Sequence, residues 1–317
     1  MGVASNDMFG ADGGDEPASP GSFGQAPTGF RLPAETRVGP VRLEIADLAR
    51  SVDYYTDILG LRLLDRCARQ AVLAANESVR PLVVLDERAW AAPSPRRGRL
   101  GLYHFAILLP DRASLGRFVR HVAHAGVRAG SADHLVSEAF YLQDPDNLGI
   151  EVYVDRPRET WRRMGRQLMM ATDPIDIASL VDTAGSDPWA GMPLGTVMGH
   201  VHLHVGAIDE AAAFYSDALG FDRIVWSYPG ALFLSAGGYH HHLGTNTWAG
   251  ATARPAADGE ARLAEWTLDL PDAEGIELAT ASLRAGGAAV ERDGSDAVTR
   301  DPWGTPVRLR VGEAVAR

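Results

Sequence analysis

Apolar residues early in the chain change their spacing within a short segment. In residues 38–45 they alternate with polar residues, which predicts a β-strand with one buried face. In residues 48–59 they recur every three or four positions, which predicts a helix, and Gly60 is suited to end it. The same order returns in residues 201–221, where Val201 follows Val41 by 201 − 41 = 160 positions. The chain is therefore predicted to be duplicated.

Each half is itself double. Residues 102–120 and 264–283 each predict a further strand followed by a helix, and both strands end on Leu-Pro-Asp. Each half also closes on a turn and a final strand. The predicted unit is a strand, a helix and three more strands, and four such modules make an α+β fold. Because a sheet this small cannot bury its own face, the modules are expected to pair into curved mixed sheets that enclose a metal cavity.

Composition divides the chain into four parts. Residues 1–35 are rich in Gly, Pro, Ser and Asp, and they are expected to form a disordered leader. Residues 36–156 and 196–314 are the two predicted domains, each of two modules. Residues 157–195 are expected to link the domains, with a helix over residues 157–170. The linker is long enough to let the second module pack against the third.

The composition also limits the classes of function. The 317 residues are 46% apolar and 22% charged, which is enough for two domains with cores. All 30 basic residues are Arg, yet the net charge is −11 and no basic run exceeds a pair, so nucleic-acid binding is not expected. No apolar run reaches the roughly 20 residues of a membrane helix, and the leader lacks a secretory signal. The single cysteine, Cys67, favours the reducing cytoplasm. A homo-oligomer stays compatible with all of this.

Residues 134–153 contain the strongest candidate for a site. A strand rich in aromatic residues, an Asp-Pro-Asp-Asn turn at residues 144–147 and a second strand at residues 149–153 follow one another. Glu151 is then a carboxylate between apolar neighbours. Burial of such a group is costly unless a cation meets it, so the segment predicts a metal ligand.

The four-module layout resembles the vicinal oxygen chelate superfamily, which includes glyoxalase I, bleomycin-resistance proteins and extradiol ring-cleaving dioxygenases. The resemblance covers about residues 36–313. Within it, one segment is similar to the extradiol dioxygenase signature, carried here by His134, Phe140, Tyr141, Asp144, Pro145 and Glu151. Ala132 and Asn147 depart from that pattern. The duplicated halves look most like the two-domain bacterial catechol 2,3-dioxygenases.

In this superfamily, metal ligands lie on the first and the last strand of a module. The first strands offer Pro40, His104, His200 and Glu265, and the last strands of modules two to four offer Glu151, His242 and Arg308. Pro40 cannot ligate and Arg308 would repel a cation. Modules two and three are therefore predicted to meet and to bring His104, Glu151 and His200 to one ion. Two imidazoles and a carboxylate suit Fe(II), with Mn(II) as the other candidate, and they leave room for substrate and dioxygen.

The resemblance also implies which residues would act on the substrate. His242 would take the acid–base role, and His134 and Tyr141 would donate hydrogen bonds to the substrate oxygens. Within the three histidines at residues 240–242 the strand phase is open, so His241 remains the alternative to His242. His200 is also the first of three alternating histidines that are expected to face the cavity together: His200, His202 and His204.

These residues favour an extradiol dioxygenase that opens a catechol-type ring at a non-haem Fe(II), with a small aromatic diol and dioxygen as its partners. Two other functions stay open. The first is a glyoxalase-type lyase or isomerase with His242 as a fourth ligand to Zn or Ni, and the second is a metal-free binding protein of the bleomycin-resistance kind. A different pairing, of the modules within each half, would instead gather His200, His242 and Glu265.

Overall fold

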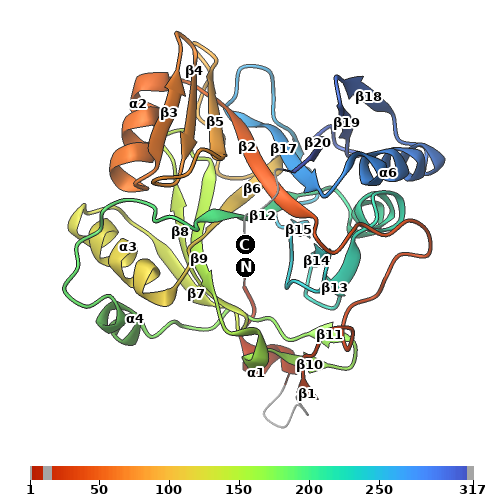
Figure 1. Cartoon of the computed structure of the whole chain (residues 1–317), viewed down its shortest axis with the longest axis horizontal. Coiled ribbons are helices and arrows are strands. Elements are labelled where there is room, and N and C mark those ends of the chain that lie inside the picture. The colour runs from red at the N-terminus through yellow and green to blue at the C-terminus, as the bar shows by residue number, and fades with distance from the viewer. Residues whose placement is uncertain (1, 10–15, 313–317) are drawn as a thin grey trace.

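Two large curved sheets dominate the fold, and each sheet takes one module from each half of the chain (Figure 1). The structure is a computed structural model, and it describes residues 2–9 and 16–312. Each module begins with a central strand, continues through a helix and returns as three strands. The four modules surround the centre of the view, with the helices outermost (Figure 1). This confirms the predicted α+β architecture.

The first sheet joins module two to module three in the strand order β13-β14-β15-β12-β6-β9-β8-β7. Its strands are β6 (Arg99–Leu108), β7 (Gly130–Asp133), β8 (Ser137–Gln143), β9 (Gly149–Asp155), β12 (Val197–His204), β13 (Asp222–Val225), β14 (Ala231–Ser235) and β15 (Leu243–Asn246). The short strand β16 (Arg254–Pro255) pairs with β6. The central strands β6 and β12 are antiparallel, and His104 is paired with His202 between them. Modules two and three therefore meet, as the ligand distribution predicted.

The second sheet joins module one to module four in the order β18-β19-β20-β17-β2-β5-β4-β3. Its strands are β2 (Arg37–Ile45), β3 (Arg62–Arg66), β4 (Gln70–Ala74), β5 (Pro81–Glu87), β17 (Arg262–Leu270), β18 (Val290–Asp293), β19 (Asp296–Arg300) and β20 (Pro306–Val311). Its central pair, β2 and β17, is also antiparallel. Modules of the same half thus lie in different sheets.

The module helices pack their apolar faces against these sheets. They are α2 (Leu48–Asp53) with η1 (Tyr54–Ile58), α3 (Arg112–His124), α5 (Ile208–Ala211) with η3 (Ala212–Ala218), and α6 (Ala273–Ala285). The repeated Leu-Pro-Asp motif has a structural cause, because its aspartate caps the helix that follows. Asp111 accepts from the backbone N–H of Ser114 at 2.7 Å, and Asp272 from that of Gly275 at 2.8 Å. Among the helices of residues 2–9 and 16–312, none has the length and apolar character needed to cross a bilayer.

The prediction of a disordered leader is wrong for residues 16–35. Leu32 donates a backbone hydrogen bond to Gly220, and Gln25 exchanges two with Arg223. Phe23 and Leu32 are buried. The segment lacks apolar periodicity of its own because it covers module three instead of forming a local core. The leader also contains α1 (Ser5–Phe9) and β1 (Glu16–Pro17), whereas residues 1 and 10–15 lie outside the described residues.

The helix expected over residues 157–170 is also absent. In its place are the turn η2 (Arg158–Thr160) and a hairpin of β10 (Arg162–Met164) and β11 (Gln167–Leu168), which pairs with β1 through β10. Gly165 takes a φ of 59° at the hairpin turn, a conformation that suits glycine. The apolar residues of the segment pack with Phe23, Tyr228 and Phe233 rather than on one helical stripe. A separate helix, α4 (Ile177–Thr183), lies later in the linker and packs against α3.

Candidate metal centre

Three neighbouring strands, β12, β6 and β9, arrange their residues around one small side chain. On β6, Ala106 is paired with His200 of β12 on one side and with Glu151 of β9 on the other. His104 lies two residues before Ala106 and therefore on the same face of β6. The methyl group of Ala106 occupies little space. The three longer side chains can therefore converge above it.

The side chains of His104, Glu151 and His200 do converge. Nε2 of His104 lies 2.9 Å and Nε2 of His200 lies 3.2 Å from Oε2 of Glu151. One potential ligand atom of each residue lies within 4.8 Å of the other two. All three residues are buried, and they come from both halves of the chain. The sequence prediction had grouped these same three residues.

Burial sets the protonation of this cluster. It lowers the pKa of His200 to about 4, so the imidazole is neutral at pH 7 and has a free lone pair. Burial alone would raise the pKa of Glu151, but His200 and His104 outweigh that effect and hold the pKa well below its usual value. At pH 7 the cluster therefore contains the Glu151 carboxylate and the neutral imidazole of His200.

The hydrogen bonding of the cluster is incomplete in a way that fits a metal ion. The close contact of His104 with Glu151 lacks the geometry of a hydrogen bond, so Nε2 of His104 is a buried atom without such a partner among the described residues. A buried nitrogen without a partner is costly. A divalent cation between the three side chains would bind Nε2 of His104 and balance the charge of the Glu151 carboxylate. Two imidazoles and a carboxylate are a ligand set that leaves coordination positions open.

His134 and Tyr141 form a pair beside the cluster. The carbonyl of Ala171 lies 2.6 Å from Nδ1 of His134, so Nδ1 carries the proton and Nε2 accepts the hydrogen bond of the Tyr141 hydroxyl at 2.5 Å. Tyr141 is paired with Glu151 across β8 and β9, and its ring lies 5.4 Å from that of His104. Burial raises the pKa of Tyr141 well above its usual value, so the phenol keeps its proton. Tyr141 therefore lies next to the cluster, and His134 is connected to it through the Tyr141 hydroxyl.

The structure does not bring His242 to the cluster. Its Nδ1 lies 3.0 Å from Oγ of Ser235 and accepts from the backbone N–H of Ala236 at 3.2 Å. The imidazole of His241 faces the cluster instead, with its ring centre 4.0 Å from that of His200. The preference for His242 assumed regular strand alternation. The three histidines lie before β15 begins and follow Gly237, Gly238 and Tyr239. The two glycines have φ of 63° and 70°, so strand alternation does not apply there.

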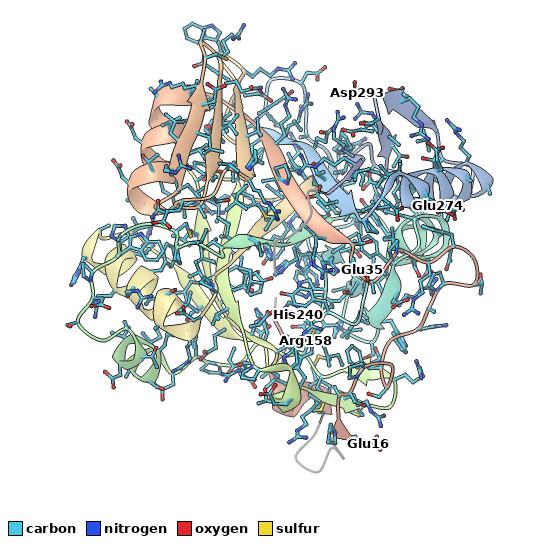
Figure 2. The ribbon with its side chains drawn as sticks, in the orientation of Figure 1. Glu16, Glu35, Arg158, His240, Glu274 and Asp293 are labelled. Carbon is cyan, nitrogen blue, oxygen red and sulfur yellow. The ribbon has the colours of Figure 1, made fainter. Side chains whose placement is uncertain are left out.

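A chain of hydrogen bonds connects His241 through His240 to Asp155, whose side chain is partly exposed. Nδ1 of His241 lies 2.7 Å from Nδ1 of His240, and Nε2 of His240 lies 3.0 Å from Oδ1 of Asp155. Figure 2 labels His240 near the centre of the view. The carboxylate of Asp155 accepts from Nε2 of His240, and a neutral His240 ring then has its Nδ1 lone pair to accept from His241. The proton of His241 is therefore on Nδ1, and its Nε2 has a free lone pair.

The comparisons with known proteins agree with this geometry. Residues 37–152 and 197–306 match the model of the Glyoxalase/Bleomycin resistance protein/Dioxygenase superfamily. The chain belongs to this superfamily. It is also 43% identical over 271 residues to a catechol-2,3-dioxygenase of Bacillus subtilis (strain 168), covering 84% of this chain and 94% of that relative.

Solved structures of the superfamily share the fold at much lower identity. Glyoxalase I from Zea mays has a TM-score of 0.52 at 18% identity, covering 87% of this chain and 92% of its own. A protein of Bacillus subtilis subsp. subtilis str. 168, assigned as a dioxygenase, has a TM-score of 0.60 at 12% identity and covers 88% of this chain and 85% of its own. At these identities the likeness concerns the fold alone.

Within this superfamily fold, the two sheets of the chain differ in chemistry. In the second sheet, Nε of Arg308 lies 2.7 Å from Oε1 of Glu265, and its Nη1 lies 2.9 Å from Asp293. Glu265 is thus neutralised by a guanidinium. The alternative site of His200, His242 and Glu265 is not assembled, because modules of one half do not share a sheet.

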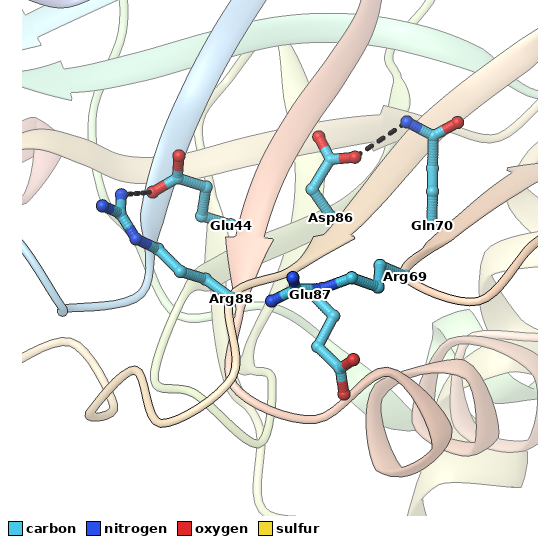
Figure 3. A pocket seen from close by; sticks show the side chains of 6 residues that line it. All are labelled: Glu44, Arg69, Gln70, Asp86, Glu87 and Arg88. Atoms are coloured by element: carbon cyan, nitrogen blue, oxygen red, sulfur yellow. Dashed lines mark hydrogen bonds and ion pairs between the residues drawn. The ribbon is translucent and has the colours of Figure 1, made fainter.

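Further polar contacts of that second sheet involve residues on or directly after β2, β4 and β5 (Figure 3). Oε2 of Glu44 accepts from Arg88 at 2.8 Å, and Oδ1 of Asp86 accepts from the amide of Gln70 at 2.8 Å. These pairs line a cavity of about 480 Å³ together with Arg69 and Glu87. Glu44 is paired with Arg88 in this cavity, whereas Nε2 of His104 in the first sheet has no hydrogen-bond partner among the described residues.

Three further polar residues, His202, His204 and Asn246, form hydrogen bonds with one another near the cluster. His202 lies next to His104, with ring centres 5.0 Å apart, and its Nε2 accepts from Nδ2 of Asn246 at 2.9 Å. The carbonyl of the same amide lies 2.7 Å from Nδ1 of His204. The shared face of His200, His202 and His204 was predicted from their alternation. Asn246 carries no sequence signal, because its role depends on the parallel pairing of β15 with β12.

Proposed function

We propose that the protein is an extradiol ring-cleaving dioxygenase. It would open a catechol-type aromatic diol with dioxygen at a non-haem Fe(II), or a Mn(II), bound by His104, Glu151 and His200. The observation that carries this proposal is the convergence of these three buried residues from the two halves, with Nε2 of His104 lacking a hydrogen-bond partner. The catechol-2,3-dioxygenase relative at 43% identity supports the same reaction class.

The metal would supply a common binding point for the two diol oxygens and for dioxygen. The protein would supply the rest of the geometry. Tyr141 has its proton directed to His134, so its oxygen lone pairs remain available to accept a hydrogen bond from a diol hydroxyl. His134 in turn is held by the Ala171 carbonyl. This pair would fix the orientation of the aromatic ring.

His241, rather than His242, is proposed as the acid–base residue. Burial lowers the pKa of His241 well below its usual value, so the residue is a neutral base at pH 7. With its Nδ1 proton directed to His240, the lone pair of Nε2 can take a proton from the diol and later return it. Asp155 and His240 would act as positioning residues, because they fix the tautomer of His241.

The glyoxalase-type alternative receives less support from the contacts. Its four-ligand shell needs His242, whose Nδ1 is already within hydrogen-bonding distance of Ser235 and Ala236. The metal-free alternative leaves a buried nitrogen of His104 without a hydrogen-bond partner, at an energetic cost.

The direct test begins with protein purified without oxygen. Metal analysis should find one iron or manganese ion per chain, and addition of catechol and dioxygen should consume both and produce a yellow ring-opened semialdehyde. Bound metal without dioxygen consumption, across a panel of substituted catechols, would refute the dioxygenase. Protein that binds no divalent metal would refute the proposed centre as well.

A further inference from the structure

A cavity of about 650 Å³ opens onto the metal centre from one side. His104 and Tyr141 line it, and so do Tyr103, Gln143, Arg96 and Arg128. The volume lies within the usual range of small-molecule sites, about 300–1,000 Å³. It therefore has room for a ring substituent in addition to the diol.

The charge of this cavity is opposite to that of the protein. The chain has 41 acidic and 30 basic residues, for a net charge of −11, yet the lining contains two Arg and no Asp or Glu. The two guanidiniums come from different segments. Arg96 precedes β6, and Arg128 lies between α3 and β7.

Neither guanidinium has a partner within the described part of the chain. The side chains of Arg96 and Arg128 form no ion pair or hydrogen bond there. Nearby arginines behave differently. Arg99 forms two hydrogen bonds with Glu260, both at 2.7 Å, and Arg112 forms two with Glu138 at 2.6 and 3.0 Å. Both side chains are exposed, so the cavity is lined by two cationic groups that water hydrates and that no described protein group pairs.

We propose that the substrate is an aromatic diol that carries a carboxylate, on the ring or on a short side chain. The carboxylate would contact Arg96 and Arg128, while the diol lies beside His104 and Tyr141. A planar guanidinium matches a carboxylate with paired N–H donors, which a neutral substituent cannot use. This inference rests on the proposed dioxygenase function and adds its substrate class.

The test compares dihydroxyphenylacetate with its methyl ester, which has the same ring and no charge. The wild-type protein should have the higher kcat/KM for the acid. Replacement of Arg96 or Arg128 by Gln should lower the acid-to-ester ratio of kcat/KM by about two- to fivefold each, as expected for an ion pair near the surface. Because Arg97 is adjacent but does not line the cavity, Arg97→Gln is the matched control and should preserve the ratio. High salt should reduce the preference of the wild type.

A second measurement separates this inference from the function on which it rests. Calorimetry with dioxygen excluded gives the affinity of the acid and of the ester for metal-loaded protein. Cleavage of both diols with equal efficiency, unaffected by the Arg96 and Arg128 variants, would overturn the carboxylate preference and leave the dioxygenase intact. Preferential binding of the acid without cleavage of either diol would overturn the dioxygenase and retain the anionic site. Equal binding of both without cleavage would overturn both.

Discussion

The hydroxyl of Tyr55 donates a hydrogen bond to Oδ2 of Asp144 at 3.1 Å, and both groups are buried. Tyr55 belongs to the helix of module one and Asp144 to the final turn of module two, so the contact joins modules that lie in different sheets. The other half repeats it between Tyr215 and Asp301 at 2.9 Å. In each half, the aspartate of the final turn therefore connects the two modules of that half.

Asp144 also shapes the turn that leads to Glu151. Its Oδ1 accepts from the backbone N–H groups of Asp146 and Leu148, both at 2.8 Å. These bonds hold the chain between β8 and β9. The placement of Glu151 in β9 thus depends on a residue that does not touch the metal centre.

The first prediction concerns the pH dependence of stability at Asp144. Burial raises its pKa from 3.8 to about 7. Below pH 4 the carboxyl is protonated in the folded and the unfolded chain, whereas between pH 4 and 7 only the unfolded chain loses the proton. Its contribution to stability is therefore lost as pH rises, by about 4 kcal/mol in total. Asp144→Asn, which can retain the contacts of Oδ1, should remove this dependence.

The measurement is chemical unfolding of both proteins from pH 4 to pH 8. Other groups titrate in this range, so the informative quantity is the difference in unfolding free energy between variant and wild type. The unfolding free energy of the variant should increase relative to that of the wild type as pH rises, and the difference should level off above pH 7. A difference that stays constant with pH would mean that Asp144 is not protonated in the folded state.

The second prediction concerns the ligands. Glu151→Ala should abolish stoichiometric binding of iron or manganese, because it removes the only carboxylate of the cluster. Glu265→Ala is the control, since Glu265 is a carboxylate on the first strand of module four, in the other sheet, and is paired with Arg308. It should leave the metal content unchanged. The measurement is the metal content of each purified variant, with circular dichroism as a check on folding. Loss of metal in the Glu265 variant alone would instead support a site of His200, His242 and Glu265.

The third prediction separates two neighbouring histidines. His241→Ala should lower kcat by about 10²–10⁴-fold with metal still bound, as removal of an acid–base group does. His242→Ala removes contacts with Ser235 and Ala236 and should mainly reduce the free energy of unfolding. Dioxygen uptake and thermal unfolding of the two variants test this. If His242→Ala lowers kcat with metal still bound and His241→Ala affects only stability, His242 is the acid–base residue.

The fourth prediction concerns Asp155, which holds the tautomer of His240 and through it that of His241. Asp155→Asn should lower kcat by about ten- to a hundredfold, as loss of an orienting partner does, with little effect on metal content. A structural role alone would not change the tautomer. Nitrogen NMR of labelled imidazoles should therefore show the proton of His241 on Nδ1 in the wild type and a mixture in the variant. An unchanged tautomer in the variant would contradict the positioning role.

The duplicated pattern of apolar residues was enough to predict the four modules, and the first and last strands of modules two and three, taken with the superfamily resemblance, were enough to group His104, Glu151 and His200. Both inferences use regular strands, in which alternation decides the face of each residue. The repeated Leu-Pro-Asp reflects a local cause as well, because the aspartate caps the next helix. Local patterns of this kind are contained in the sequence itself.

Tertiary structure decided the features that depend on distant contacts. Which histidine faces the cluster follows from a turn at Gly237 and Gly238, where alternation is interrupted. Residues 16–35 and 157–170 take their conformation from the surface of module three and from each other, so their own composition was misleading. Arg96 and Arg128 lie 128 − 96 = 32 positions apart in the sequence, and only the fold brings them to the same cavity. Local periodicity determines an element and its face, whereas irregular segments are determined by the surfaces against which they pack.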